Sequence, residues 1–526
     1  MALAATEGEA EDLAIDALPD ELLMRCFNAL PLRDRAVAAC VSTDWRFALA
    51  SPLAWRDLDF SLGTSHGGCR VTPVTEAAFY SCCRRAQGQM RTLNLAQQGV
   101  NLRPSSLLNV LRMNHHLRIV RATELRFPWS GAQIQAALTM AKEMHTLESK
   151  AYLTVEGGET SASLLAAIKS GRFECKELHV AGRIRVDALA ALADAMAGGS
   201  RLRMLHLAFS DVNDDGAAVL GRGLAAARGL RSLNLRANNI SAVGARTLAT
   251  ALSTNAGLES LVLGSNRVGD EGMASFAAAL KKNTSLVFLD VSGNSITEDG
   301  ALSLASSLLA NTTLQHINLD FNSIGATGVA ALAAVLPRCG VTSLDLEWNG
   351  IRCAGATCLA YTISLPGSRI RRLGLASNGI CAGGATICAG ALRNNRSLEE
   401  LILNNNPRMG PDGVGCLAAA LAAEACSLKR LELAGCCIDE ATMFIVAASL
   451  SLSRLEALNI GENATVGSAA TVALAHAVRR NETIRELSFS IVPQSEELGH
   501  VAEVTLLREA NSAWRGVPSS KVHLFH

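Results

Sequence analysis

Apolar and polar positions alternate in a short phrase that occurs five times between residues 229 and 349. The five copies are LRSLNLRANNI from Leu230, LESLVLGSNRV from Leu258, LVFLDVSGNSI from Leu286, LQHINLDFNSI from Leu314 and VTSLDLEWNGI from Val341. Their common form is LxxLxLxxNxI, and it recurs every 27 or 28 residues. Within each copy the alternation predicts a short strand with one buried face. The Asn that follows can hydrogen-bond backbone groups where the chain turns away from the strand.

Between these strands the sequence predicts a helix with small residues at fixed places. Gly244 begins one such stretch, and Ala249 stands five residues later. The same Gly recurs at Gly272, Gly300, Gly328, Gly355, Gly384 and Gly413, and the same Ala at Ala277, Ala305, Ala333, Ala360, Ala389 and Ala418. A small residue there lets the helix lie close to the strand layer. We expect Asn255, Asn283, Asn311 and Asn395 to end helices in the left-handed conformation.

A fixed period of this size predicts an α/β solenoid of leucine-rich repeats, in which a parallel inner sheet is backed by outer helices. A strand and a full helix in 27–29 residues resemble the ribonuclease-inhibitor subclass, which implies a horseshoe. The expected strand centres are 93, 125, 153, 178, 205, 233, 261, 289, 317, 344, 373, 401, 431, 458 and 487. The copies at Leu125 and Leu153 lack the Asn, so the register between residues 117 and 175 stays open.

A different pattern precedes the repeats, from Asp16 to Phe60. Its apolar residues fall at helical spacing, with Pro19 in a first helical turn and Pro31 ending that helix. The segment resembles an F-box. The matching motifs are LPDELL from Leu18, FNALP from Phe27, VSTDWR from Val41 and PLAWRDL from Pro52, in the order and spacing of the family. One departure is Arg35, where the family usually has an apolar residue.

The F-box resemblance implies a small all-α domain that docks on a Skp-family linker protein, and through it on a cullin-RING ligase. By motif position the docking residues are Leu18, Pro19, Leu22, Phe27, Pro31, Val41 and Trp55. The expected organisation is a disordered acidic tail at 1–14, the F-box at 16–60, a linker at 61–74, a solenoid of about 15 repeats at 75–492 (degenerate at 117–175) and a C-terminal cap at 493–526.

The composition limits the classes of binding partner and the cellular compartment that the sequence favours. The 48 basic and 48 acidic residues balance, so no global field favours nucleic acid or an acidic membrane. No apolar run is long enough for a membrane helix, and the first residues lack the basic and apolar regions of a signal peptide. The 15 cysteines are dispersed without a CxxC motif, which indicates reduced thiols in a cytoplasmic or nuclear protein.

No catalytic, cofactor or metal site is predicted. The stretch from Asp211 to Gly216 imitates the start of a calcium loop, but Arg222 stands where a bidentate Glu is needed. We therefore interpret it as a turn. Cys436 and Cys437 lie where Cys can replace the turn Asn of such repeats.

The inner face of the sheet carries the candidate binding residues. Most strands place small or neutral residues there, but three or four neighbouring repeats place larger and acidic ones. This set is Phe288, Asp290, His316, Asp320, Phe321, Asp345, Glu347 and Trp348. Aromatic rings among carboxylates are typical of a binding surface for a basic protein. Arg369, Arg371 and Arg372 follow on the next strand and extend or delimit the surface.

The two parts together resemble an F-box/leucine-rich-repeat protein. The resemblance implies a non-catalytic substrate-recognition subunit of an SCF-type ubiquitin ligase, acting by proximity. Two alternatives remain open. One is a repeat scaffold or inhibitor without ligase function, and the other is a GTPase-activating repeat protein, since activators of the Ran GTPase share this repeat subclass.

Overall fold

A computed structural model describes residues 177–463 and 468–490, together with five strands outside those ranges. These strands are β1 (Asp57–Asp59), β2 (Thr92–Asn94), β3 (Ile119–Arg121), β4 (Lys150–Thr154) and β17 (Lys521–Phe525). The chain divides into two compact units. The first comprises residues 1–191 and 200–206, and the second comprises 192–199 and 207–526.

In the first unit, strands pair in parallel in two groups. β1, β2 and β3 pair in that order, with Leu58 beside Leu93 and Leu93 beside Val120. β4 pairs with β5 (Glu177–Ala181), and β5 pairs with β6 (Met204–His206).

This pairing corrects two of the predicted strand centres. The third strand is centred on Val120 and not on Leu125. In the next strand Ala151, rather than Leu153, stands beside Leu178. The leucine pattern fails here because Val120 and Ala151 stand at the positions that pair with leucines of the neighbouring strands. Leu58, which we assigned to the end of the F-box, already belongs to a strand.

The second unit alternates strands and helices, which confirms the predicted α/β solenoid. Its strands are β7 (Ser232–Asn234), β8 (Ser260–Val262), β9 (Phe288–Asp290), β10 (His316–Asn318), β11 (Ser343–Asp345), β12 (Arg372–Gly374), β13 (Glu400–Ile402), β14 (Arg430–Glu432), β15 (Ala457–Ile460) and β16 (Glu486–Ser490), with β17 beside β16. From β7 to β17 each strand pairs in parallel with the next.

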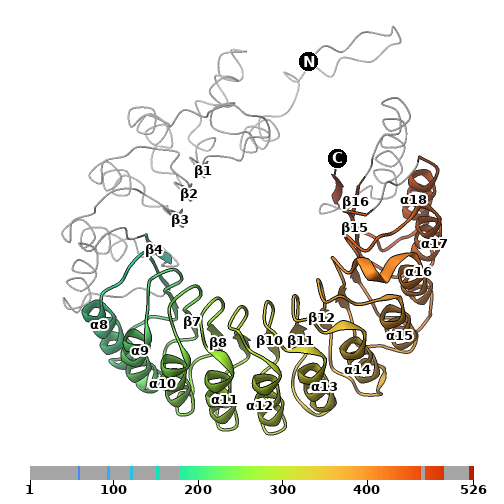
Figure 1. The fold of residues 1–526 in the computed structure, drawn as a ribbon. Helices are drawn as coiled ribbons and strands as arrows, with labels where there is room; N and C mark the ends of the chain where they lie inside the picture. Colours follow the sequence, from blue (N-terminus) through green and yellow to red (C-terminus); the bar gives the residue numbers. More distant parts are fainter. Residues whose placement is uncertain are drawn as a thin grey trace, which may run out of the picture. The chain divides into compact units, whose positions relative to one another are not determined.

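The helices follow the strands in turn. They are α9 (Asp214–Ala226), α10 (Ala242–Leu252), α11 (Gly269–Leu280), α12 (Glu298–Leu308), α13 (Gly325–Val335), α14 (Arg352–Ser364), α15 (Ala382–Leu392), α16 (Gly410–Leu421), α17 (Glu440–Leu450) and α18 (Ser468–Arg480), with the short 3-10 helices η3 (Leu336–Arg338) and η4 (Pro407–Met409). An earlier helix, α8 (Val186–Ala197), contains residues of both units. Within the second unit the array is curved, with strands on its inner side and helices on its outer side (Figure 1).

The core lies between the strand layer and the helices. The central strand leucines, such as Leu233, Leu261 and Leu289, are fully buried. The predicted small residues, such as Ala249, are buried as well. A fully buried leucine contributes roughly 2 kcal/mol relative to an exposed one, so each repeat is held mainly by contacts with its two neighbours.

The recurring glycine has a physical reason that the sequence pattern alone did not show. A Cβ on Gly272 would lie 2.6 Å from Cγ1 of Val268 and 2.9 Å from Cβ of Ala245 in the preceding helix. Gly300 and Gly328 are crowded in the same way by the residue four positions before them. The glycine therefore lets consecutive helices approach closely at their N-terminal ends.

The turn asparagines form a buried ladder that joins consecutive repeats. Nδ2 of Asn238 donates to the carbonyl oxygens of Leu207 and Leu235 at 2.7 and 2.8 Å. Its Oδ1 accepts from the amides of Ser210 and Val212 at 3.1 and 2.9 Å. The same pattern recurs at Asn266, Asn294, Asn322, Asn349, Asn378, Asn406 and Asn463. Each such Asn satisfies backbone groups that no strand or helix bonds would satisfy.

Cys436 replaces the Asn in one turn, as predicted, and its thiol donates to the carbonyl oxygen of Leu403.

The asparagines at the helix ends have a role that differs from the predicted one. Asn255 does not adopt the left-handed conformation. Its Nδ2 donates to the carbonyl oxygens of Leu224 and Ala227 in the preceding repeat, at 2.7 and 2.8 Å. Its Oδ1 accepts from the amides of Gly257 and Leu258. These residues therefore form a second ladder between repeats, and the helix-ending prediction was wrong in its mechanism.

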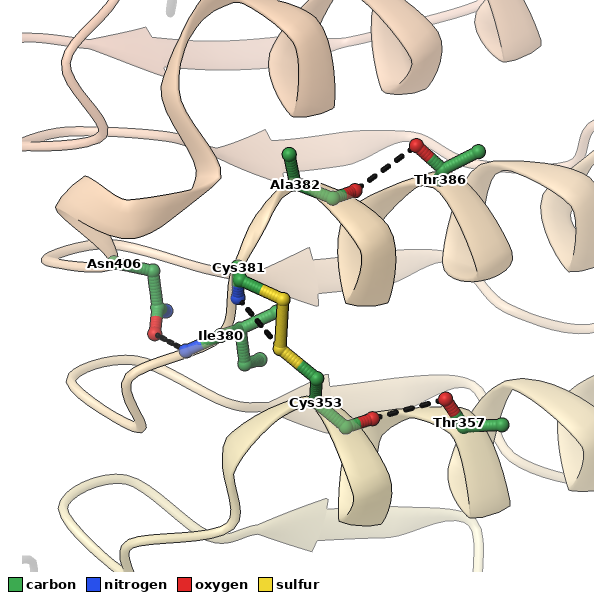
Figure 2. Close-up of a disulfide and its surroundings, with 7 residues drawn as sticks. All are labelled: Cys353, Thr357, Ile380, Cys381, Ala382, Thr386 and Asn406. Carbon is green, nitrogen blue, oxygen red and sulfur yellow. Dashed lines mark hydrogen bonds between the residues drawn. A yellow bond between two sulfur atoms is a disulfide. The ribbon is translucent and has the colours of Figure 1, made fainter.

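Cysteine usage also departs from the prediction of free thiols. Cys353, in the first turn of α14, forms a disulfide with Cys381, the residue before α15, across Cα atoms 5.9 Å apart (Figure 2). In two other repeats an aspartate stands at the position of Cys353, and it accepts a hydrogen bond from the residue of the following repeat that corresponds to Cys381. Oδ1 of Asp270, for example, accepts from the amide of Thr297. Sγ of Cys353 accepts from the amide of Cys381 in that arrangement. Because these two positions of consecutive repeats are in contact whatever residues occupy them, Cys353 and Cys381 lie close enough to form the disulfide.

Candidate protein-binding surface

One position in each turn has a left-handed backbone, immediately before the ladder Asn or its replacement. Its occupants are Phe209, Ala237, Ser265, Gly293, Phe321, Trp348, Ser377, Asn405, Gly435 and Glu462, with φ between 52° and 66°. An L-residue in this region has its Cβ crowded by its own backbone, and the strain is greatest for bulky side chains. Most repeats accordingly place a small or flexible residue there.

Phe321 and Trp348 depart from this preference in two consecutive turns. Their side chains are 59% and 58% exposed, and the ring centroids lie 6.3 Å apart at an interplanar angle of 14°. Both rings stand in a strained backbone conformation and bury little surface. A contribution to folding therefore does not explain why these two positions carry aromatic residues. Strain of roughly 1–2 kcal/mol combined with exposed apolar surface is characteristic of a functional position.

Each of these rings follows a carboxylate, so the sequences Asp-Phe-Asn and Glu-Trp-Asn occupy equivalent places. We call Asp320, Phe321, Glu347 and Trp348 the acid–aromatic patch. The two turns are joined directly, because the Glu347 amide donates to Oδ1 of Asp320 at 2.7 Å and the Phe321 amide donates to the Glu347 carbonyl at 2.8 Å. The patch therefore has a fixed backbone.

Electrostatics distinguishes Asp320 from an ordinary surface carboxylate. Burial raises the pKa of Asp320 to about 7, aided by the negative charges of Glu347, Asp345 and Asp290 and opposed by the hydrogen bond from the Glu347 amide. Burial and the negative charge of the nearby Asp345 also raise the pKa of Glu347, and the charge of Arg372 opposes them. Within residues 177–463 and 468–490, neither Asp320 nor Glu347 has a Lys, Arg or His side chain within ion-pair distance.

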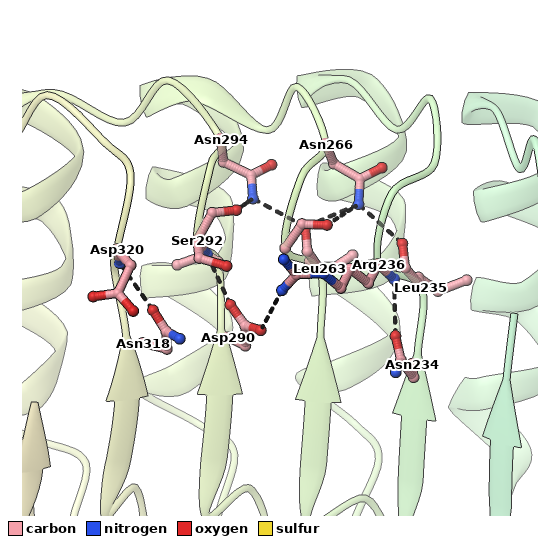
Figure 3. A network of polar contacts seen from close by, with 12 residues as sticks. Asn234, Leu235, Arg236, Leu263, Asn266, Asp290, Ser292, Asn294, Asn318 and Asp320 are labelled. Carbon is pink, nitrogen blue, oxygen red and sulfur yellow. Dashed lines mark hydrogen bonds and ion pairs between the residues drawn. The ribbon is translucent and has the colours of Figure 1, made fainter. Parts of the chain in front are cut away.

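The other predicted acidic residues are already neutralised by intramolecular partners. Asp290 is buried, accepts from the Ser292 amide and lies 3.8 Å from Nη1 of Arg236 (Figure 3). A Cβ at Gly264, on the path between them, would lie 3.1 Å from that Nη1, so the glycine leaves room for the arginine.

Asp345 is likewise neutralised, because Nε of Arg372 lies 3.1 Å from its Oδ1. Arg372 also pairs with Glu400. Next to it, Arg371 pairs with Glu399 at 2.9 Å. The predicted basic group therefore contains two cations that already have anionic partners, and only the exposed Arg369 has no ion pair within the described ranges.

Phe288 and His316 stand side by side on β9 and β10, and both are half-buried. The predicted set of eight thus separates into four residues of the acid–aromatic patch, two neutralised aspartates and two half-buried strand residues. Its role in binding stays a prediction.

Sequence reasoning did not identify two features of this surface. The first is Phe209, which occupies the same left-handed position and is 68% exposed. The second is the repeated acid–aromatic–Asn motif, which aligning the turns by their Asn would have found.

The remaining predicted sites are distributed as follows. The F-box docking residues Leu18, Pro19, Leu22, Phe27, Pro31, Val41 and Trp55 lie outside the described residues. Asn213 caps α9 by accepting from the Gly216 amide, so the calcium-like stretch is a helix cap. Among the described residues, no group of His, Cys, Asp and Glu side chains could hold a metal ion, and no helix has the length and apolarity to cross a membrane.

Comparison with known families adds two matches. Residues 15–61 match the F-box-like family, and the ranges 228–249, 254–277, 282–305, 310–333, 341–360 and 394–418 match the Leucine Rich repeat family.

Among relatives, "NACHT, LRR and PYD domains-containing protein 3" of Homo sapiens is 36% identical over 125 residues, which cover 24% of this chain and 12% of that protein. Ribonuclease inhibitor of Sus scrofa is 29% identical over 183 residues, or 34% of this chain and 40% of the inhibitor. The chain therefore matches less than half the length of either relative. A solved structure of the Rad7 and Elc1 complex in yeast has a TM-score of 0.43 and 14% identity, covering 68% of this chain and 86% of that chain.

Proposed function

Because an F-box-like domain at residues 15–61 is followed by leucine-rich repeats of the ribonuclease-inhibitor type, we propose that this protein is the substrate-recognition subunit of an SCF-type cullin-RING ubiquitin ligase. The F-box docks a Skp-family linker, which connects the chain to the cullin and RING components. The inner face of the repeats binds the protein substrate. Such an architecture is typical of non-catalytic adaptors.

The observation that carries the proposal is the order of the two parts. An F-box gives a docking function that repeats alone do not imply. The repeats give a long sheet surface whose exposed side chains vary while the buried ones recur. In this arrangement the protein accelerates ubiquitin transfer by raising the local concentration of substrate lysines near the ubiquitin thioester. The reaction takes place in the cytoplasm or the nucleus.

The acid–aromatic patch supports the second half of the proposal. It offers exposed rings beside carboxylates that have no ion-pair partner among the described residues, which is the composition of an interaction hot spot. No chemistry is required of these residues, because binding and orientation are sufficient for an adaptor.

The test is capture of a purified Skp-family linker by the full chain, with and without residues 16–56. The deletion ends before β1, because Asp57–Asp59 pairs with β2 and its loss would disturb the first sheet. We expect the full chain to capture the linker and the deleted chain to lose it, while the repeats of both chains unfold at the same temperature. An intact chain that captures no linker contradicts the ligase proposal and leaves the scaffold or inhibitor alternative.

A further inference from the structure

We infer that the acid–aromatic patch is a binding site for an arginine side chain presented by the protein substrate. This inference rests on the proposed function, because it specifies the chemistry of the substrate that the repeats would recruit. It assigns the site to Asp320, Phe321, Glu347 and Trp348.

The aromatic half of the site is available to a ligand. The rings of Phe321 and Trp348 are each more than half exposed and nearly parallel. They come from the adjacent turns that follow β10 and β11, and they stand as a stacked pair of nearly parallel rings. A cation placed over the face of such rings is attracted by their quadrupole, and tryptophan is the strongest of the aromatic side chains in this respect.

The acidic half of the site supplies charge complementarity. In the neighbouring strands Arg236 lies beside Asp290 and Arg372 beside Asp345, so those carboxylates need no external cation. Asp320 and Glu347 have no such partner within residues 177–463 and 468–490. A negative pair beside exposed rings therefore remains for a cation from another molecule.

Arginine satisfies both halves at once. Its planar guanidinium can lie flat on an aromatic face while its edge donates two parallel hydrogen bonds to a carboxylate. Lysine carries a compact, strongly hydrated charge that cannot make this combined contact. We therefore expect the site to discriminate between the two basic residues and to reject an uncharged analogue of arginine.

Occupancy of the site couples to the protonation of Asp320. Its pKa of about 7 means that much of it is protonated at neutral pH in the free protein. A bound cation favours the ionised form, so binding strengthens as pH rises through 7 and weakens as pH falls below it. The charged and titratable groups around it are Asp290 with Arg236, His316, Asp345 with Arg372, and Glu347.

The experiment selects peptides from a random phage-displayed library on the immobilised full chain. The most enriched peptide is then synthesised with Arg, Lys or citrulline at its enriched position, and its affinity is measured by fluorescence anisotropy. The test variant is Phe321→Ser with Trp348→Ser, because Ser265 and Ser377 occupy the same turn position in other repeats. The control variant is Phe209→Ser, which removes an exposed ring from the equivalent position of a distant turn.

We expect wild type to enrich arginine, with affinity about tenfold lower for lysine and lower still for citrulline. The double variant should lose about tenfold in affinity, whereas Phe209→Ser should change it less than twofold. Wild-type affinity should fall about tenfold between pH 8 and pH 6, because the ionised fraction of a carboxyl with a pKa of about 7 falls by that factor. Asp320→Asn can still accept the Glu347 amide and should remove most of this pH dependence. Peptide selection without arginine enrichment, or equal affinities for wild type and the double variant, overturns the inference.

The test of the arginine site can fail or succeed independently of the test of the ligase proposal. Capture of the Skp-family linker depends on residues 15–61 and is measured on the same variants. Arginine binding without linker capture would reject the ligase and keep the site. Linker capture without arginine binding would keep the ligase and reject the site.

Discussion

Replacing Asn322 by Ala tests whether the asparagine ladder holds the repeats together. The side chain is 7% exposed. Nδ2 donates to the carbonyl oxygens of Val291 and Leu319 at 3.1 and 2.9 Å. Oδ1 accepts from the amides of Asn294 and Ile296 at 3.0 and 2.9 Å. The substitution leaves all four groups without this partner in a buried turn.

The expected loss of stability follows from those four bonds. A buried hydrogen bond contributes about 1 kcal/mol, and a buried group left without a partner costs at least as much. Four bonds give about 4 kcal/mol, which is a large effect for one substitution. In a solenoid the loss falls first on the adjoining repeats, because each contacts only its neighbours.

Urea denaturation followed by circular dichroism measures the total effect, and hydrogen exchange measures it locally. We expect the amides of Asn294 and Ile296 to lose protection. The matched control is Asn318→Ala, which removes one bond, from the Asp320 amide, at a half-buried strand position. A stability change no larger than that of the control, or unchanged protection of both amides, would refute the reasoning.

Two further predictions concern packing and covalent structure. Gly272→Ala should destabilise the protein by about 2 kcal/mol through overpacking, whereas Gly390→Ala, where a Cβ meets nothing within 4 Å, should stabilise it by about 1 kcal/mol in the same assay. A loss of stability at Gly390 equal to that at Gly272 would contradict the close-approach argument. Alkylation without reduction should leave Cys353 and Cys381 unlabelled and their peptides linked in mass spectrometry. Labelling of both thiols would exclude the disulfide in the purified chain.

The sequence predicted the buried part of the second unit well, because burial imposes the same residue on every repeat. Leu233, Leu261 and Leu289 occupy the positions that the period assigned to them. The period failed in the first unit, where Val120 and Ala151 pair with Leu93 and Leu178 without the leucine signature. Strand pairing there is decided by backbone hydrogen bonds, which a residue pattern does not encode.

The candidate site was only partly predictable for a related reason. The alternation of apolar and polar positions placed Asp290 and Asp345 on the inner face of the sheet. It did not show whether an arginine from another strand forms an ion pair with either of them. Arg236 reaches Asp290 from two strands away, past a glycine that leaves space for it. Likewise, left-handed φ at Trp348 is a property of the turn, and only the structure shows that a bulky ring stands at a strained place.

The direction of the asparagine ladder determines the order in which the chain can become structured during synthesis. Asn349 bonds the carbonyl of Leu319 and the amide of Ile324, so the turn that carries Phe321 is completed by the repeat that follows it. The Phe321 amide itself awaits the carbonyl of Glu347. As the polypeptide leaves the ribosome, the turn that follows each strand therefore lacks part of its hydrogen bonds until the next repeat has emerged. A chain truncated between these two turns would present Phe321 on an open end instead of a fixed surface.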